Sequence, residues 1–344
     1  MKAEIDRVPA SRAALALALP THGVAVSPDV TPEAIAEAAL IQGIAVEVHK
    51  AAVSLGLDDL AQALKPAATA ITLNGMHMFV MTNRLVALFE SAGIPSSVVK
   101  GFGLAQLTRA NPFGRPATDM DLLIPPDRVV AAHRLLLSRG GSLLPGYIPP
   151  DESRAFSVLL RLRHEATYGF EGQSLDLHWH LGSARRILPT TKDALARSVT
   201  VETRGFRLPT LGVHDALVHS AVHWRMSGFR GLKYVLDLEA LRAKLSPDEL
   251  SALQPFVKRV LIVARKLRTS TPQAQPTGWV PRSMWHQAYN GLSSNGRGGI
   301  IDTRVRLASL VAQLRDTPGP DRLVVPLNVG VGPALRQYRR VRGL

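Results

Sequence analysis

Hydrophobic and polar positions in residues 1–93 follow the spacing of α-helices. The apolar run at 13–19, Ala-Ala-Leu-Ala-Leu-Ala-Leu, predicts a first helix. Thr31 can cap a second helix, and Pro32 suits a first helical position. Further apolar residues recur at helical spacing up to the stop signal Gly93-Ile94-Pro95, namely Phe79, Val80, Leu85, Val86, Leu88 and Phe89. We therefore expect a helical N-terminal region whose main role is packing.

After Pro95, short β-type and helical segments alternate. Residues 97–99 form a β-type run that ends in Lys100-Gly101-Phe102-Gly103, and a short helix is expected over 104–109. Proline and glycine make 111–116 a loop, and 119–124 reads as a strand closed by two prolines. The apolar face of the next predicted helix, which Gly140-Gly141 ends, consists of Val129, Val130, Leu135, Leu136 and Leu137. This stretch predicts a strand–helix–strand–helix unit.

Residues 164–181 have the pattern of a β-hairpin. Two β-type runs, 166–170 and 174–181, flank the turn-like Glu171-Gly172-Gln173. The second run alternates, with Leu175, Leu177, Trp179 and Leu181 on one face and Asp176, His178 and His180 on the other. The apolar face, including Trp179, is expected to pack in the core, which leaves the polar face for chemistry.

The C-terminal part is predicted to be helical up to residue 268. Residues 269–299 are rich in Ser, Thr, Pro, Gln, Asn and Gly, so we expect a loop or linker there, followed by a basic tail. The sequence thus predicts four parts: a helical region (1–93), a mixed core (94–210), a second helical region (211–268), and a linker with a basic tail (269–344).

Composition limits the class of protein. Hydrophobic residues make up 46% of the 344 residues, which is ordinary for a globular protein. No apolar run approaches the roughly 20 residues that span a bilayer. The absence of cysteine excludes disulfides, thiolate zinc sites and cysteine nucleophiles, and it fits a cytoplasmic protein.

The charge points toward a phosphate-bearing partner. The formal net charge is +14, and most of the 41 basic residues are arginine. The planar fork of arginine suits phosphate better than the point charge of lysine does. An arginine-rich composition also follows from a GC-rich genome, so charge alone does not identify the partner.

Two aspartates on one predicted strand form a candidate metal site. Asp119 and Asp121 are two residues apart, so their side chains project to the same side of a strand. Two neighbouring carboxylates repel unless a cation neutralises them, and Mg²⁺ is commonly held by carboxylates together with substrate phosphates. The alternative is an acidic strand end in solvent. A third aspartate, Asp176, together with Lys100 and Arg115, favours the metal site over this alternative.

In combination, these motifs resemble a known family. Lys100-Gly101-x-x-Leu104, then Arg115-x-x-x-Asp119-x-Asp121-Leu122-Leu123-Ile124, then Asp176-Leu177-His178-Trp179, are similar to the uncharacterised nucleotidyltransferase family of the DNA polymerase β-like superfamily. His223-Trp224 and Asp237-Leu238 resemble the helical C-terminal part of the same family. The resemblance covers about residues 30 to 265.

The resemblance implies an α+β fold, with a small mixed β-sheet forming the nucleotidyltransferase catalytic core (94–210) between helical N-terminal and C-terminal parts. It implies transfer of a nucleoside monophosphate from an NTP, with Mg²⁺ or Mn²⁺ as cofactor and pyrophosphate as leaving group. The residues to which it assigns roles are Asp119 and Asp121 as ligands of both metals, Asp176 as a further ligand and catalytic residue, Lys100, Gly101 and Gly103 at the triphosphate, and Arg115 at a phosphate or the pyrophosphate.

Two positions need separate comment, the residue that follows Gly101 and His178. The superfamily usually carries a Gly-Ser pair after the first strand, whereas here Phe102 follows Gly101, so the serine contact to a phosphate is missing. His178 shares the polar face of Asp176, where it either orients a carboxylate or touches the nucleotide, or else is a hydrogen-bonded core histidine.

The acceptor is not encoded in any motif. Relatives with this pattern are met near genes for peptide natural products, so the resemblance makes a peptide a candidate acceptor, beside small molecules. One alternative is a glycosyltransferase that holds a nucleotide-sugar through Asp-x-Asp. A second is a basic nucleic-acid-binding protein without catalysis. A third is a regulatory or toxin-type transferase that modifies a protein or tRNA.

Overall fold

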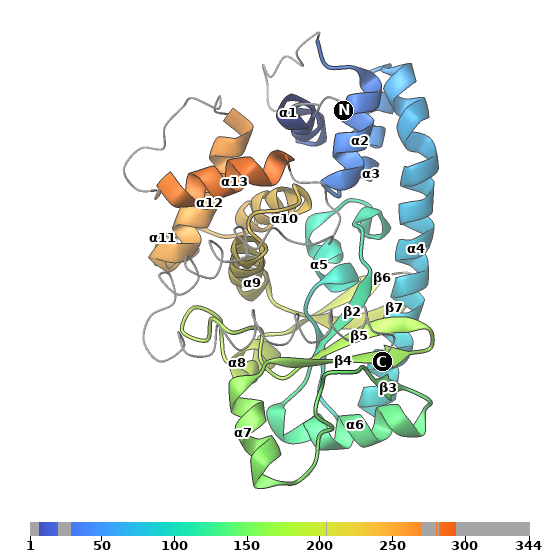
Figure 1. The fold of residues 1–344 in the computed structure, drawn as a ribbon, viewed down its shortest axis with the longest axis vertical. Coiled ribbons are helices and arrows are strands. Elements are labelled where there is room, and N and C mark those ends of the chain that lie inside the picture. The colour runs from blue at the N-terminus through green and yellow to red at the C-terminus, as the bar shows by residue number, and fades with distance from the viewer. Residues whose placement is uncertain (1–6, 20–28, 204, 270–279, 281, 294–344) are drawn as a thin grey trace. The chain divides into compact units, whose positions relative to one another are not determined.

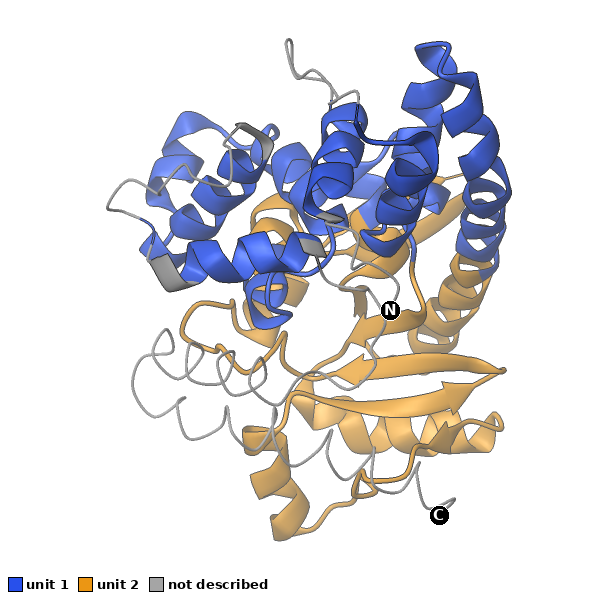
Figure 2. Ribbon diagram, turned by 45° about the horizontal axis from the view of Figure 1, so that its top comes forward, with its two compact units in different colours: residues 1–77, 105–116, 220–301 blue, residues 78–104, 117–219, 302–344 orange. Residues whose placement is uncertain are grey.

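The fold is described from a computed structural model, which places residues 7–19, 29–203, 205–269, 280 and 282–293. The chain forms two compact units, each assembled from separate stretches of sequence (Figure 2). Unit 1 contains the described parts of 1–77, 105–116 and 220–301, and unit 2 contains those of 78–104 and 117–219.

Unit 1 is helical. It contains α1 (Arg7–Ala18), α2 (Pro32–Ile41), α3 (Ala45–Ser54), the first part of α4 (Asp58–Ser91), α10 (Lys233–Arg242), α11 (Pro247–Ala252), α12 (Pro255–Thr269) and α13 (Arg282–Ser293) (Figure 1). The predicted start of α2 is confirmed, because the Thr31 hydroxyl accepts a hydrogen bond from the Ala34 amide and Pro32 is the first helical residue. α9 (Val213–Met226) and α4 each continue from one unit into the other.

One prediction for the C-terminal part is wrong. Residues 269–299 were expected to be a loop or linker, but α13 forms at Arg282–Ser293. Met284, Trp285, Ala288 and Leu292 recur at helical spacing and are buried. Their burial stabilises a helix that local composition disfavours. Residues 270–279, 281 and 294–344, which include the predicted basic tail, lie outside the described residues.

Unit 2 is built on a seven-stranded mixed sheet. In chain order its strands are β1 (Ser97–Val98), β2 (Asp119–Leu123), β3 (Ser142–Leu143), β4 (Glu165–Phe170), β5 (Gln173–His178), β6 (Val199–Thr203) and β7 (Phe206–Thr210). They lie side by side in the order β3-β4-β5-β2-β1-β7-β6. β2 is parallel to β5 and β1 is parallel to β7, while the other neighbours are antiparallel. The predicted class, an α+β protein with a mixed sheet and helical flanking parts, is confirmed.

The predicted hairpin is also present. β4 and β5 pair in an antiparallel register that joins Phe170 to Gln173. The two residues between them, Glu171 and Gly172, have φ angles of 47° and 78°. Positive φ at both central positions matches the right-handed twist of the flanking strands.

Unit 2 also contains α6 (Val129–Ser138), α7 (Arg154–Leu162) and α8 (Thr191–Ala196), and α5 (Gly101–Thr108) begins in unit 2 and continues into unit 1. Two 3₁₀ turns, Pro112–Gly114 and Pro126–Arg128, lie at the predicted turns of the chain. α5 begins three residues earlier than the predicted 104–109, so Gly101 and Gly103 are part of the helix.

One face of the sheet is apolar and covered by α6. Met120, Leu122, Leu175 and Leu177 alternate with the polar residues of β2 and β5 and are buried. Tyr168 of β4 lies on the same face, and its hydroxyl is 3.0 Å from Nδ1 of His133 in α6. Because this face is fixed in the core, the register of β2, β4 and β5 directs a set of polar side chains to the opposite face, namely Asp119, Asp121, Glu165, Thr167, Asp176 and His178.

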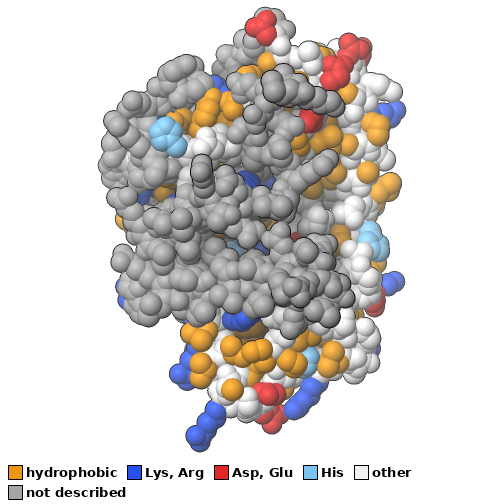
Figure 3. Space-filling model, in the orientation of Figure 1, with side chains coloured by type: hydrophobic (Ala, Val, Ile, Leu, Met, Phe, Trp, Pro, Cys, Tyr) orange, Lys and Arg blue, Asp and Glu red, His pale blue; other side chains and the backbone are white. Residues whose placement is uncertain are grey.

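Some hydrophobic side chains of unit 2 remain exposed. Leu137, Ile148 and Val158 are among them, and the lower part of the face in Figure 3 shows hydrophobic side chains between Lys and Arg. No helix among the described residues is both long and apolar enough to cross a membrane.

Gly103 allows α5 to approach the sheet closely. A Cβ atom at this position would lie against the Thr210 hydroxyl, 3.0 Å from Thr210 Cβ and 3.1 Å from Val98 Cβ. The Thr210 hydroxyl donates a hydrogen bond to the Val98 carbonyl, 2.7 Å away, so it cannot move freely. We therefore expect Gly103→Ala to lower the free energy of unfolding by ~1–2 kcal/mol, because overpacking outweighs the gain in helix propensity.

Urea denaturation of the wild type and Gly103→Ala would measure this loss. In a Thr210→Ala background the cost of Gly103→Ala should become smaller, since the obstructing hydroxyl is gone. A Gly103→Ala variant as stable as the wild type would contradict the close approach.

Candidate active site

The polar face of the sheet gathers carboxylates from neighbouring strands. β2 and β5 are parallel and in register, so Asp121 lies directly opposite Asp176. On β5 the next polar residue, His178, lies opposite Glu165 of β4. Side chains directly opposite one another on adjacent strands are about 5 Å apart at Cβ. Strand pairing therefore assembles this group from residues 57 or fewer positions apart in the chain.

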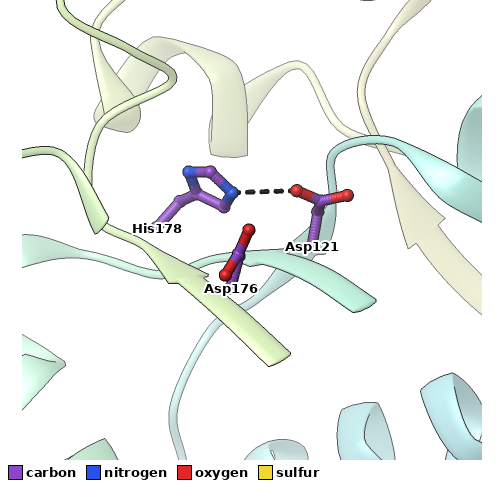
Figure 4. A group of neighbouring side chains, drawn as sticks. All are labelled: Asp121, Asp176 and His178. Carbon is purple, nitrogen blue, oxygen red and sulfur yellow. Dashed lines mark hydrogen bonds and ion pairs between the residues drawn. The ribbon is translucent and has the colours of Figure 1, made fainter. Parts of the chain in front are cut away.

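Three of these side chains could hold a metal ion. Asp121, Asp176 and His178 each offer a ligand atom, and these atoms all lie within 4.8 Å of one another. Figure 4 shows the three side chains converging above β2 and β5. Asp121 and His178 are buried and Asp176 is half-buried. Two carboxylates and one imidazole are a donor set that fits a divalent metal ion.

Asp121 is held between two cationic groups. Lys100 donates a hydrogen bond from Nζ to Oδ1 of Asp121 at 2.7 Å, and Nε2 of His178 lies 3.1 Å from the same oxygen. Burial alone would raise the pKa of Asp121, but the charge of Lys100 and the hydrogen bond from His178 more than offset it and lower that pKa. Conversely, the pKa of Lys100 is raised, since the nearby carboxylates outweigh its burial. The pair is therefore ionised.

Asp176 has a different environment. Its Oδ1 accepts a hydrogen bond from the Thr167 hydroxyl at 2.7 Å, and Thr167 is in turn 2.8 Å from the Tyr147 hydroxyl. Burial raises the pKa of Asp176 to about 6, and the charge of Glu165 acts in the same direction. Within the sheet, Asp176 thus holds its proton more tightly than Asp121 does.

His178 lies between two carboxylates. Its Nε2 faces Asp121, and its Nδ1 lies 3.3 Å from Oε2 of Glu165. Burial opposes the charged imidazolium, but the hydrogen bond to Asp121 and the charge of Glu165 raise the pKa of His178 overall. His178 therefore contacts a carboxylate, and its contact with the nucleotide stays a prediction. Trp179, by contrast, is buried and donates from Nε1 to the Leu160 and Arg163 carbonyls, which is a packing role.

Asp119 lies on β2 two residues before Asp121 and on the same face. It is half-buried and not part of the three-residue group, although its charge contributes to the raised pKa of Lys100.

Sequence reasoning missed Glu165, because the predicted strand began at residue 166. Only the hairpin register, which pairs Glu165 with His178, reveals its position.

The remaining predicted site residues are Arg115, Gly101 and Gly103. Arg115 belongs to unit 1, where its guanidinium is buried and donates to both carboxylate oxygens of Asp237 at 3.0–3.3 Å. Gly101 is the first residue of α5 and has a positive φ of 53°. Gly103 lies against β7 and β1 as described above. The phosphate-binding roles of these residues stay predictions.

Asp237 anchors a buried ionic network in unit 1. Besides Arg115, it contacts Nη2 of Arg109 at 2.9 Å and accepts a hydrogen bond from the Thr108 hydroxyl. Arg109 also pairs with Glu47 of α3. Burial would raise the pKa of Asp237, but the two guanidinium groups lower it overall.

The arrangement in unit 2 defines a class of protein. The mixed sheet carries Asp-x-Asp on one strand and a third aspartate in register on its parallel neighbour. The family described as uncharacterised nucleotidyltransferase matches residues 29–264, which is more than half of the chain. The chain belongs to this family.

Among solved structures, the chain is similar to the antibiotic-resistance factor ANT(2'')-Ia. The two are 11% identical, the similarity covers 56% of this chain and 92% of that chain, and the TM-score is 0.37. No curated protein matches the sequence.

The Asp237 network leads to a stability prediction. Asp237→Asn removes the charge between two buried guanidinium groups, so we expect the free energy of unfolding to fall by ~3–5 kcal/mol. Glu152→Gln is the matched control, because Glu152 forms an exposed pair with Arg134 and should have little effect. Urea denaturation would measure both changes. A loss no larger than that of the control would show that the network contributes nothing to unit 1.

A second prediction concerns pH. Burial lowers the pKa of His219 to about 3, and the positive charges of Lys100 and His178 act in the same direction although Asp121 opposes them. The unfolded chain binds a proton at this side chain near pH 6.5, whereas the folded chain does so only near pH 3. The contribution of His219 to stability is therefore complete above about pH 6.5 and is lost as the pH falls toward 3.

His219→Gln should flatten the decline of unfolding free energy between about pH 6.5 and 4, whatever its constant effect on stability. Parallel denaturation series for wild type and variant would give the two slopes. Equal slopes would mean that the imidazole titrates alike in both states.

Proposed function

We propose that this chain is a metal-dependent nucleotidyltransferase that moves a nucleoside monophosphate from an NTP to an acceptor, with release of pyrophosphate. The observation that carries the proposal is the in-register parallel pairing of β2 and β5, which brings Asp121 and Asp176 together on one face of the sheet. Membership of the nucleotidyltransferase family supports the reaction class.

The carboxylates of Asp119, Asp121 and Asp176 would hold the divalent metal ions, Mg²⁺ or Mn²⁺. When bound, such ions neutralise the triphosphate and make an acceptor hydroxyl easier to deprotonate. The spacing of the Asp121, Asp176 and His178 ligand atoms supports this assignment for Asp121 and Asp176.

The protein side chains position the donor and accept the proton. A bond forms between the acceptor oxygen and the α-phosphorus, the bond from that phosphorus to the bridging oxygen breaks, and pyrophosphate carries away the electron pair. Asp176 would take the proton of the acceptor, and the hydrogen bond from the Thr167 hydroxyl to its carboxylate supports this role.

Lys100 would contact the donor phosphates in place of the usual serine. The side chain that follows Gly101, where the superfamily has serine, is Phe102; it is buried, and its ring centroid lies 4.3 Å from that of Phe79. A core aromatic cannot bind phosphate, so the cation beside Asp121 is the group left for this role. Arg115 is not part of the proposal, because Asp237 engages its guanidinium.

The acceptor is proposed only by class. The family resemblance favours a peptide or a small molecule with a free hydroxyl. Because the site described here contacts the donor and the metal ions, donor binding can be tested before any acceptor is identified.

The donor site predicts metal-dependent nucleotide binding. Calorimetric titration of each of the four NTPs, with and without Mg²⁺ or Mn²⁺, should show binding that requires the metal and is lost in Asp119→Asn. Asp127→Asn is the matched control, since Asp127 is an exposed aspartate shortly after β2. No binding under any of these conditions would rule out an NTP as donor.

The proposed role of the aspartates in catalysis predicts a large loss of turnover. Asp119→Asn and Asp121→Asn should each lower metal-dependent release of pyrophosphate from the bound NTP by ~10²-fold or more, because even groups behind metal ligands are typically worth 10- to 100-fold. Near-wild-type release in either variant would remove that aspartate from the metal site. Release of a nucleoside diphosphate from a nucleotide-sugar would indicate a glycosyltransferase instead.

A further inference from the structure

We propose that Glu165 is a positioning residue that directs Nε2 of His178 at the metal site and thereby makes His178 a nitrogen ligand. Neither residue belongs to the Asp-x-Asp strand. The inference rests on the metal site of the proposed function, and it adds to that site one ligand and the residue that orients it.

Glu165 is held in place by the backbone. It begins β4 and pairs directly with His178 across the antiparallel hairpin, so the two side chains share one face. Its Oε2 lies 3.3 Å from Nδ1 of His178 and 3.4 Å from Nε2 of His164. The rings of these two histidines stack, with centroids 6.2 Å apart and planes at 29°. The contacts with these two histidines thus fix the Glu165 carboxylate.

The two ring nitrogens of His178 face different carboxylates, Nε2 facing Asp121 and Nδ1 facing Glu165. A neutral imidazole carries a single proton, and the other nitrogen then offers a lone pair. When a metal ion takes the place of the proton on Nε2, the carboxylate of Glu165, 3.3 Å from Nδ1, favours keeping the remaining proton on Nδ1. Nε2, which lies 3.1 Å from Oδ1 of Asp121, is then the nitrogen available to a metal ion.

This is the arrangement of a carboxylate behind a metal-bound histidine. Such a carboxylate fixes the ring orientation and the tautomer and raises the basicity of the ligand nitrogen, and its loss typically costs 10- to 100-fold in metal affinity. The side chain of His178 is only 2% exposed, so water cannot easily replace Glu165 as the partner of Nδ1.

An imidazole ligand also sets metal preference. Mg²⁺ favours oxygen ligands, whereas nitrogen ligands suit transition metals. A site formed by Asp121, Asp176 and His178 should therefore prefer Mn²⁺, and the spectroscopic probe Zn²⁺, to Mg²⁺. The preference should depend on His178 and not on the aspartates alone.

The first test measures binding of the metal alone, without nucleotide or turnover. Titration calorimetry with Mn²⁺ should show affinity lower by about 10-fold or more in Glu165→Gln than in the wild type. Glu202→Gln is the matched control, because Glu202 is also a strand glutamate but is exposed and pairs with exposed Arg207. Equal affinity in wild type and a folded Glu165→Gln variant would overturn the proposal.

The second test separates positioning from a general structural role. The ratio of Mn²⁺ to Mg²⁺ affinity should fall toward one in His178→Gln, and NMR of histidine-labelled protein with Zn²⁺ should show the metal on Nε2 in the wild type. Metal on Nδ1, or an unchanged ratio in His178→Gln, would refute the role of Glu165 even if Asp121→Asn abolishes binding. If the wild type binds no metal, or if Asp121→Asn binds as well as the wild type, the metal site of the proposed function fails, and this inference fails with it.

Discussion

Negative charge gathered on a partly buried sheet face must be balanced, and this constraint shapes the centre of unit 2. Asp121 is almost inaccessible to solvent, yet it is ionised because Lys100 and His178 both contact its Oδ1. Removing both partners would leave an unpaired buried carboxylate, which is far more costly than losing a surface ion pair. A divalent cation could take over the contact that these two groups make with Oδ1 of Asp121. The same carboxylate oxygen would then serve both the ion pairs of the fold and the proposed metal site.

The sheet order makes this balance possible. β1 and β5 both neighbour β2, so Lys100, two residues after β1, and His178 of β5 reach Asp121 from opposite sides. The apolar face of the sheet includes Leu122 and Leu177, and α6 covers it. A shift in register would turn these side chains away from the core, so their burial fixes the direction of the polar side chains as well. Strand pairing thus supplies positions, and hydrophobic burial supplies the rigidity that a metal site requires.

Unit 1 uses the same principle for a structural purpose. Asp237 is buried between Arg109 and Arg115, and hydrogen bonds satisfy its carboxylate. Arg115 immediately precedes the segment that leads into β2, so its spacing from Asp119 resembles that of a phosphate-binding arginine. Its partner, however, lies 122 residues away on another helix. Spacing within a motif therefore identifies a residue without identifying what it contacts.

Local pattern alone determined a large part of this protein. Alternation along 174–181 separated Asp176 and His178 from Leu175 and Leu177, and the two-residue spacing put Asp119 and Asp121 on one face, because side chains of a strand alternate wherever it lies. Tertiary structure decided which strands became neighbours. The contact of Glu165 with His178, the pairing of Lys100 with Asp121, and the burial of α13 all depend on it. These contacts join residues far apart in sequence, and their energy comes from burial and charge pairing that exist only once the chain has folded.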